Sequence, residues 1–401
     1  MNSNFHKLFI FLIILLFLAG PNSYRTKASD EKNIFIKTGI SSGQKTEKKR
    51  VLIIAPHPDD ETLGCARVIS LNENEGNKVK IVLMTNGELY YRPKGNKIFD
   101  FDRDGDINYI DYGYIRQQET LTAMAKLGVN KKDIIFLCYP DASLMDIYNC
   151  NYNDLYVGIN NGFSLALALQ VRGSNKSPFK NSYHQKIFKK EAVFTREYVI
   201  EDLENILSDF RPTDIYVTHE FDFHDDHKAT PLFIREAIKR LKERKGYEVD
   251  SIRVHRYLIH FDIPDKARMM DEYPDPKNPR LGVRDFVDNC KPVPWEMTVI
   301  GSPPNGSISL DENFKITKHE LINCYQTQIF DDYFPKECNG ETGYSWLHQF
   351  VKDKEEWWDW PVDYYIPFDY YDKFSLFSKI RHYLKIILTI TKVKLKSFLT
   401  K

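Results

Sequence analysis

Several hallmarks of common protein classes are absent from this chain of 401 residues. It carries no net charge, with 56 Lys and Arg against 56 Asp and Glu, so its overall charge gives no indication of nucleic-acid binding. It contains no internal repeat and no long low-complexity tract. Its six cysteines form no Cys-x-x-Cys pair, so no cysteine zinc site is indicated. With 42% hydrophobic residues, the chain can nevertheless bury a sizeable core.

Two signatures of well-known enzyme classes are also missing. No Gly-x-Ser-x-Gly elbow joins a predicted strand to a predicted helix, which argues against a serine-nucleophile hydrolase. The first predicted strand is not followed by Gly-x-Gly-x-x-Gly, which argues against a dinucleotide cofactor at that place.

An unbroken apolar run, Leu8 to Ala19, lies near the N-terminus. Its length suits the core of a signal peptide and is short of the roughly twenty residues that a membrane span needs. No clear Ala-x-Ala cleavage site follows, so a cleaved signal and a retained anchor both stay open. We therefore expect an exported protein, secreted, periplasmic or membrane-anchored and facing outside. Residues 1–20 would be the signal or anchor, and the polar residues 21–48 a linker.

Short apolar strands and longer helices alternate through the middle of the chain. Predicted strands cover 51–55, 79–85, 134–137 and 215–218, and predicted helices cover 61–73, 114–127, 196–210 and 229–241. This alternation predicts right-handed βαβ units, and hence an α/β, mainly parallel sheet with helices on both faces. Cys65 and Cys138 fall inside these elements and are expected to be small buried thiols.

A polar cluster, His57-Pro58-Asp59-Asp60-Glu61, follows the first predicted strand. In an open α/β sheet the ligand crevice lies at the carboxyl ends of the strands, so this is a place where chemistry is expected. Imidazole and carboxylate together suit zinc, and a spare carboxylate can act as a base. The alternative is that Pro58 starts a helix and the acids merely complement its dipole.

A second cluster follows the predicted strand 215–218 and contains His219, Asp222, His224 and His227. Two of these histidines, three residues apart, can present both rings to one point. Taken alone, the cluster would also fit a polar surface loop. Two such clusters at strand ends favour a shared metal site.

Together, Pro-His57-Pro-Asp-Asp60-Glu and His224-x-Asp226-His227 resemble the PIG-L/LmbE family of zinc-dependent N-deacetylases. Weaker family-like pieces are Thr85-Asn86-Gly87-Glu88, Arg116-x-x-Glu119, Tyr139-Pro140-Asp141 and a late helix over Lys318–Gln328. The resemblance covers about residues 49–330. It implies a Rossmann-like fold, one catalytic Zn2+, and removal of an N-acetyl group from a glycan or glycoconjugate containing N-acetylglucosamine.

The resemblance also implies roles for single residues. Zinc would be held by His57, Asp60 and His227, with open positions for water and substrate. Asp59 would be the general base for that water.

The remaining roles concern the second motif. His224 would either polarise the tetrahedral oxyanion or protonate the leaving amine. Asp226 would hold a proton on one of the histidines, although it and Asp225 could equally be surface acids. His219 and Asp222 match no ligand of the family and are given no role. Alternative functions are hydrolysis of a non-sugar amide, or a calcium-dependent carbohydrate-binding or scaffold protein.

One motif departs from the family. Residues 100–111 place side-chain oxygens at positions 1, 3, 5, 9 and 12 of a twelve-residue loop, with glycine at position 6, as in an EF-hand. A structural Ca2+ site is therefore predicted, with the ligands Asp100, Asp102, Asp104, Asp106 and Asp111. Position 7 of this loop type contributes its backbone carbonyl, so Asp106 need not bind the ion through its side chain. The alternative is a solvated acidic hairpin.

The C-terminal part divides into two segments. Residues 331–372 form an aromatic-rich extension, whose Trp357, Trp358 and Trp360 would either stack on sugar rings or pack in the protein. Residues 373–401 contain Lys and Arg but no acid, and their apolar residues recur at helical spacing. They predict a basic amphipathic helix that lies on an anionic membrane surface or docks on the domain.

Overall fold

The computed structural model describes residues 48–90, 109–150, 177–260, 303–329 and 346–359, with short gaps at 178, 192, 223, 245–248 and 250. All of them lie in one compact unit that begins at Lys48. The predicted signal or anchor, nearly all of the linker, residues 100–108 and the basic C-terminal helix lie outside the described residues. Within the described residues, no helix is both long enough and apolar enough to cross a membrane.

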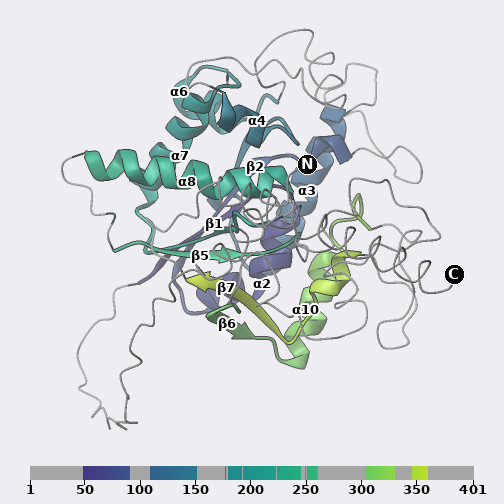
Figure 1. Ribbon diagram of the computed structural model, residues 1–401. Coiled ribbons are helices and arrows are strands. Elements are labelled where there is room, and N and C mark those ends of the chain that lie inside the picture. Colours follow the sequence, from purple (N-terminus) through teal and green to yellow (C-terminus); the bar gives the residue numbers. More distant parts are fainter. Residues whose placement is uncertain are drawn as a thin grey trace, which may run out of the picture. The chain divides into compact units, whose positions relative to one another are not determined.

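A seven-stranded sheet forms the centre of the described fold, in the order β3-β2-β1-β4-β5-β7-β6 (Figure 1). Strands β1 to β5 pair in parallel, whereas β7 runs antiparallel to β5 and to β6. The strands are β1 (Arg50–Ala55), β2 (Lys78–Thr85), β3 (Ile134–Tyr139), β4 (Asp214–Thr218), β5 (Arg253–Tyr257), β6 (Gly306–Ser309) and β7 (Lys354–Asp359). The predicted mainly parallel α/β architecture is confirmed.

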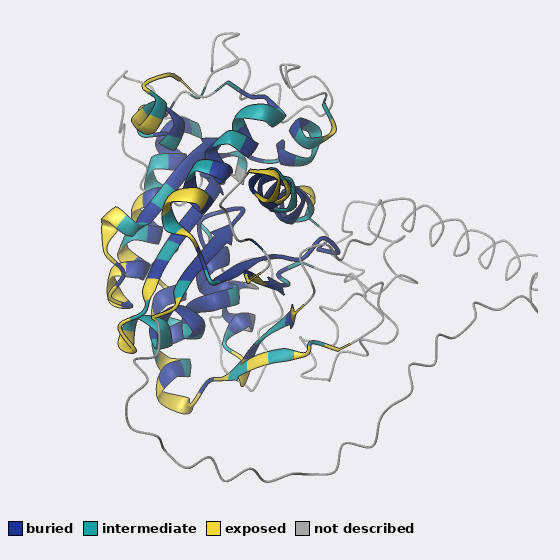
Figure 2. Cartoon of the chain, turned by 90° about the vertical axis from the view of Figure 1, so that its left-hand side faces the viewer, coloured by how far each residue is buried: buried dark blue, intermediate teal, exposed yellow. Residues whose placement is uncertain are grey.

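Helices cover both faces of this sheet. One face carries α2 (Asp60–Asn74), α3 (Tyr109–Lys126) and α10 (Glu312–Ile322). The other carries α4 (Leu144–Asn149), α6 (Tyr183–Phe188), α7 (Arg196–Phe210) and α8 (Asp225–Glu243). Successive side chains of a strand point to opposite faces, so Ile53 joins the first core while Leu52 and Ile54 join the second. Figure 2 shows this burial along the strands and the inward sides of the helices.

Two helices begin earlier than the sequence predicts. Helix α3 starts at Tyr109 instead of residue 114, and α8 starts at Asp225 instead of residue 229. Gly113 follows the first turn of α3, and a Cβ atom there would lie 2.7 Å from the ring of Phe179. Glycine therefore allows the ring of Phe179 to approach the helix backbone closely. Because glycine has a low helix propensity, the sequence does not predict the helix this early. The late helix α10 covers Glu312–Ile322, earlier than the predicted 318–328.

Strands β5, β6 and β7 were not predicted as strands. Strand β7 lies within the aromatic-rich extension and pairs with β5 and β6 of the central sheet. Trp358 on this strand is 1% exposed, and its ring lies 5.1 Å from that of His219. This tryptophan packs in the protein. Cys65 and Cys138 are buried free thiols, as expected.

Candidate functional site

Polar side chains gather where the parallel strands end. The ends of β1 to β5 are followed, in that order, by His57, Glu88, Asp141, Asp222 and His260. The first four are buried and the last is partly buried. The carboxyl ends of parallel strands share one edge of the sheet, so residues distant in sequence meet there.

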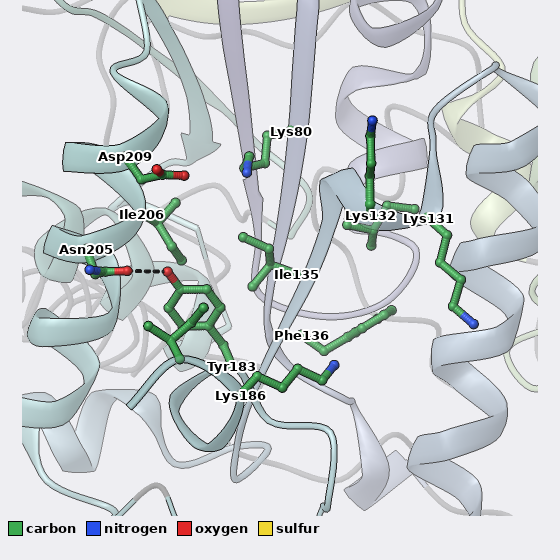
Figure 3. A pocket seen from close by; sticks show the side chains of 12 residues that line it. Lys80, Lys131, Lys132, Ile135, Phe136, Tyr183, Lys186, Asn205, Ile206 and Asp209 are labelled. Atoms are coloured by element: carbon green, nitrogen blue, oxygen red, sulfur yellow. Dashed lines mark hydrogen bonds between the residues drawn. The ribbon is translucent and has the colours of Figure 1, made fainter. Parts of the chain in front are cut away.

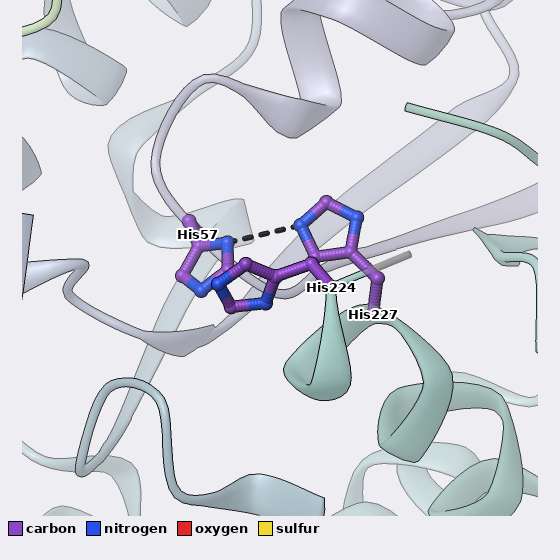
Figure 4. A group of neighbouring side chains, drawn as sticks. All are labelled: His57, His224 and His227. Atoms are coloured by element: carbon purple, nitrogen blue, oxygen red, sulfur yellow. Dashed lines mark hydrogen bonds between the residues drawn. The ribbon is translucent and has the colours of Figure 1, made fainter. Parts of the chain in front are cut away.

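Three side-chain atoms from two of these places converge. His57 Nδ1 lies 3.2 Å from Asp60 Oδ2 and 3.1 Å from His227 Nε2, and His227 Nε2 lies 3.2 Å from Asp60 Oδ2. Figure 4 shows the rings of His57 and His227 facing each other, with the ring of His224 beside them. Tetrahedral zinc with bonds of ~2.1 Å places its ligand atoms roughly 3.4 Å apart, so this spacing fits zinc.

The other nitrogen of each imidazole faces a carboxylate. His57 Nε2 lies 3.0 Å from Asp141 Oδ1 and 3.2 Å from Asp226 Oδ2. His227 Nδ1 lies 3.2 Å from Asp222 Oδ2. A carboxylate keeps a proton on the nitrogen that it faces, so in the neutral rings both lone pairs point toward Asp60. Three electron-pair donors directed at one point repel one another unless a cation lies between them.

The charges around these atoms favour such a cation. Burial lowers the pKa of His227, but Asp222 and Asp60 raise it to a net value of about 9. Burial likewise lowers the pKa of His57, and Asp141 raises it well above its ordinary value. Conversely, burial raises the pKa of Asp60 but His227 lowers it, and the result is well below its ordinary value. The pocket between the rings is therefore suited to positive charge.

The start of α8 fixes the position of His227. His224 caps this helix, because its Nδ1 accepts the N–H of Asp226 at 3.2 Å. Pro231 has no N–H to offer the carbonyl of His227, four residues earlier. The Thr218 hydroxyl at the end of β4 donates to that carbonyl instead, at 2.9 Å. His227 is thus tied to the sheet by its own backbone carbonyl.

Asp59 has an unusual backbone beside these ligands. Its φ of 116° is rare for any residue other than glycine. Arg116 holds it from one side, donating to Asp59 Oδ2 at 3.1 Å and to the Pro58 carbonyl at 2.5 Å. Glu61 Oε2 accepts the Asp59 N–H at 3.1 Å. Such strain persists only where surrounding contacts impose it, and it concentrates at functional sites. Burial raises the pKa of Asp59 well above its usual range, against the opposing effect of Arg116, and this suits a proton acceptor.

Glu61 is positioned in turn from a distant part of the chain. The Tyr325 hydroxyl, in the turn after α10, donates to Glu61 Oε1 at 2.5 Å and lies 2.8 Å from Thr62 Oγ1. Burial raises the pKa of Glu61 to about 7, although Tyr325 acts to lower it. The backbone of Asp59 is therefore held through Glu61 by Tyr325.

Residues 52–238 match the profile of the family described as "PIG-L: GlcNAc-PI de-N-acetylase". This range includes both polar motifs and the three converging atoms. The chain contains a PIG-L family domain. A search of curated proteins finds no match to it.

Several solved structures are similar to this chain. The N,N'-diacetylchitobiose deacetylase from Pyrococcus horikoshii has 17% identity and a TM-score of 0.43, over 79% of this chain and 85% of that one. The zinc-inhibited form of teicoplanin deacetylase Orf2 has 15% identity and a TM-score of 0.38, over 70% and 85%. The 4-carboxy-2-hydroxymuconate hydratase from Pseudomonas putida KT2440 has 14% identity and a TM-score of 0.38, over 69% and 78%. At these identities the three names say nothing about what this chain acts on.

Within the PIG-L domain, the two neighbouring acids of the second motif lie in different environments. Asp226 is 0% exposed, and its carboxylate accepts the N–H groups of Ala142 at 2.7 Å and Leu144 at 2.8 Å besides facing His57. Asp225 has a side chain that is 68% exposed and pairs with Lys228 at 2.9 Å. Asp226 therefore lies in the site and Asp225 on the surface.

Three further residues, Asp222, Asp141 and Arg116, have no role predicted from the sequence but contact the site in the structure. Asp222 and Asp141 each face a histidine of the converging set, and Arg116 binds Asp59. Arg116 is also why residue 87 is glycine, since a Cβ there would lie 1.7 Å from its Nη1. Both acids follow a strand of the parallel sheet, which is the sequence signal that identifies them. His219, also given no role, lies against Phe221 and Trp358 instead of the site.

The calcium prediction remains a prediction. Of its five acids only Asp111 is described, and it is buried in the first turn of α3. Asp100, Asp102, Asp104 and Asp106 lie outside the described residues.

A separate cavity of about 470 Å³ lies between β2, β3, α6 and α7 (Figure 3). Its lining includes Lys80, Lys131, Lys132 and Lys186, and none of the residues of the histidine site. In Figure 3 the amines of these lysines point in different directions, so they do not converge on one ligand. This cavity is therefore separate from the histidine site.

Proposed function

We propose that this protein uses one zinc ion to hydrolyse the N-acetyl group of a glycan or glycoconjugate that contains N-acetylglucosamine, outside the cytoplasm. The observation that carries the proposal is the convergence of His57 Nδ1, Asp60 Oδ2 and His227 Nε2 within a PIG-L domain. Zinc held by these atoms would lower the pKa of a water molecule toward ~7 and polarise the acetyl carbonyl.

Asp59 takes the proton of the attacking water. Its carboxylate lies next to the ligand Asp60 in sequence, and burial gives it a raised pKa that makes it a stronger base than an exposed aspartate. Arg116 keeps the carboxylate in place through Oδ2. The same raised pKa allows Asp59 to release this proton to the departing amine, which must gain one to leave.

His224 stabilises the oxyanion of the tetrahedral intermediate. Its Nδ1 accepts the Asp226 N–H, so the proton of the neutral ring is on Nε2. Burial and the proximity of His57 both lower its pKa, which supports this neutral form. A neutral ring donates a hydrogen bond from Nε2, whereas an imidazolium would have to break the bond from Asp226. Of the two roles open to His224, this contact supports polarisation of the oxyanion over protonation of the amine.

The substrate and the location rest on different observations. The family description names an N-acetylglucosamine-containing molecule, which supports that sugar unit here. The apolar run Leu8 to Ala19 supports export. Localisation of a tagged full-length chain by cell fractionation tests the second point, and a purely cytoplasmic protein would contradict it.

Acetate release from purified full-length protein tests the activity. The substrates are N-acetylglucosamine, its oligosaccharides, and N-acetylglucosamine linked to phosphatidylinositol. We expect acetate from at least one of them, abolished by a zinc chelator and restored by added zinc. A zinc-loaded protein that releases no acetate from any would contradict the sugar substrate and favour a non-sugar amide. Activity that follows calcium instead of zinc would contradict the metal assignment.

A further inference from the structure

Asp222 is fully buried in the loop that joins β4 to α8, and three backbone N–H groups donate to its carboxylate. Oδ1 accepts the backbone N–H of His224 at 3.0 Å. Oδ2 accepts the backbone N–H groups of Ile259 at 3.0 Å and His260 at 2.9 Å, and faces His227 Nδ1 at 3.2 Å. Three backbone N–H donors stabilise the negative charge of a carboxylate, so this arrangement favours the ionised form of Asp222.

This arrangement decides which nitrogen of His227 carries a proton. An ionised carboxylate is an acceptor only, so the nitrogen that faces it, Nδ1, must donate. The lone pair is then on Nε2, the atom that lies 3.2 Å from Asp60 Oδ2. Replacing one carboxylate oxygen of Asp222 with an amide nitrogen would remove the preference for a proton on His227 Nδ1.

The same carboxylate also places the second catalytic histidine. The bond from the His224 N–H to Oδ1 fixes the backbone one residue before α8 begins. The His224 ring is then fixed by the Asp226 N–H. Because Ile259 and His260 follow β5, the carboxylate also joins this loop to the neighbouring strand end. The ring of His260 lies 4.9 Å from that of His227.

We propose that Asp222 is the positioning residue that makes the zinc ligand His227 and the oxyanion donor His224 part of one rigid unit. It touches neither zinc nor substrate and acts through the two histidines. This inference rests on the proposed function, but it concerns metal affinity and geometry, which are measured without substrate.

The test compares Asp222→Asn with Asp225→Asn. Both change one acid near the start of α8 to its amide, but the side chain of Asp225 is 68% exposed and pairs with Lys228 on the same helix. Zinc affinity is measured by competition with a chromophoric chelator. We expect Asp222→Asn to bind zinc about 10–100-fold more weakly and Asp225→Asn to bind it like wild type. At saturating zinc, kcat of Asp222→Asn should stay below wild type, because His224 has also lost its anchor.

A purely structural role predicts a different result. In that case Asp222→Asn would lower the Tm of the zinc-free protein while a folded sample bound zinc as tightly as wild type, and this would overturn the inference. Nitrogen-15 NMR of zinc-loaded wild type provides a second test that needs no folded variant. His227 should be bound through Nε2 with a proton on Nδ1, and zinc on Nδ1 would overturn the inference. Zinc-loaded wild type without deacetylase activity would refute the proposed function alone.

Discussion

Replacing Asp59 with asparagine tests whether this carboxylate moves the proton in the reaction. Asparagine is chosen for the backbone, because a φ of 116° is tolerated by few residues besides Gly, Asn and Asp. Alanine at such a position holds strain of about 1–3 kcal/mol without the polar contacts that support it, so loss of the base and movement of the loop would be confused. The amide oxygen of asparagine can still accept the hydrogen bond from Arg116.

We expect Asp59→Asn to lower kcat by ~10²–10⁴-fold, the range for loss of a general base. This corresponds to about 3–5 kcal/mol in the activation barrier. Neither neighbouring acid can replace the missing base. Asp60 directs Oδ2 to the converging histidines, and Glu61 is occupied by Tyr325 and by the Asp59 N–H.

The assay is acetate release at saturating zinc, with bound zinc measured by elemental analysis of the same samples. Asp59→Asn should keep one zinc per chain, whereas the reciprocal variant His227→Ala should lose it. An unchanged kcat in Asp59→Asn would refute the assignment of the base. Loss of zinc together with activity would instead make Asp59 a metal ligand.

Three further predictions concern stability. Tyr325→Phe should lower the Tm by a few degrees, because the buried Glu61 carboxylate loses a hydrogen-bond donor at a cost of about 1–3 kcal/mol. A Tm that calorimetry finds unchanged would contradict this contact. Burial raises the pKa of Glu119 to about 6 although its contacts with Thr327 act to lower it, so the folded state binds its proton more tightly than the unfolded state. The stability that this proton contributes is complete below about pH 4.5 and is lost as pH rises through 6. Because Gln does not titrate, the Tm of Glu119→Gln should rise relative to the Tm of wild type between about pH 5 and 7.5. A Tm difference that stays constant over this range would refute the prediction. Millimolar calcium should raise Tm and protect residues 99–112 from proteolysis without changing zinc content, and equal cleavage with and without calcium would favour an acidic hairpin.

The strands that precede the proposed zinc ligands could be predicted because the signal lies in their own residues and in those directly after them. The run Val51 to Ala55 is apolar on both faces, which is typical of a parallel strand covered by helices on both sides. The polar residues directly after such a strand lie at the catalytic edge whatever the rest of the chain does. This is why the zinc ligands could be proposed without coordinates.

Strands β5 and β7 could not be predicted in this way, because their buried positions hold charged residues. On β5, His255 Nε2 meets Asp214 Oδ1 at 3.1 Å, and Arg256 Nε meets Glu220 Oε2 at 3.1 Å. On β7, the buried Glu355 accepts from Lys318 of α10 at 2.7 Å. Buried charges are tolerated only when paired, and these partners lie far apart in the sequence. An alternation pattern that assumes apolar burial therefore misses both strands.

Local and long-range signals also differ between the proposed metal ligands and the residues that position them, here called supports. The proposed ligands His57 and Asp60 are three residues apart, and this residue pair at this spacing already indicates a metal site. The supports are set by tertiary contacts: Tyr325 reaches Glu61 across 264 residues of sequence, and Asp222 reaches the end of β5 across 38. A support needs only to place a donor or acceptor at the right point, so many residue types on many elements can serve, and no local motif is required. The contacts that hold Asp59 and His227 in place could thus be found only once the strands had been brought together.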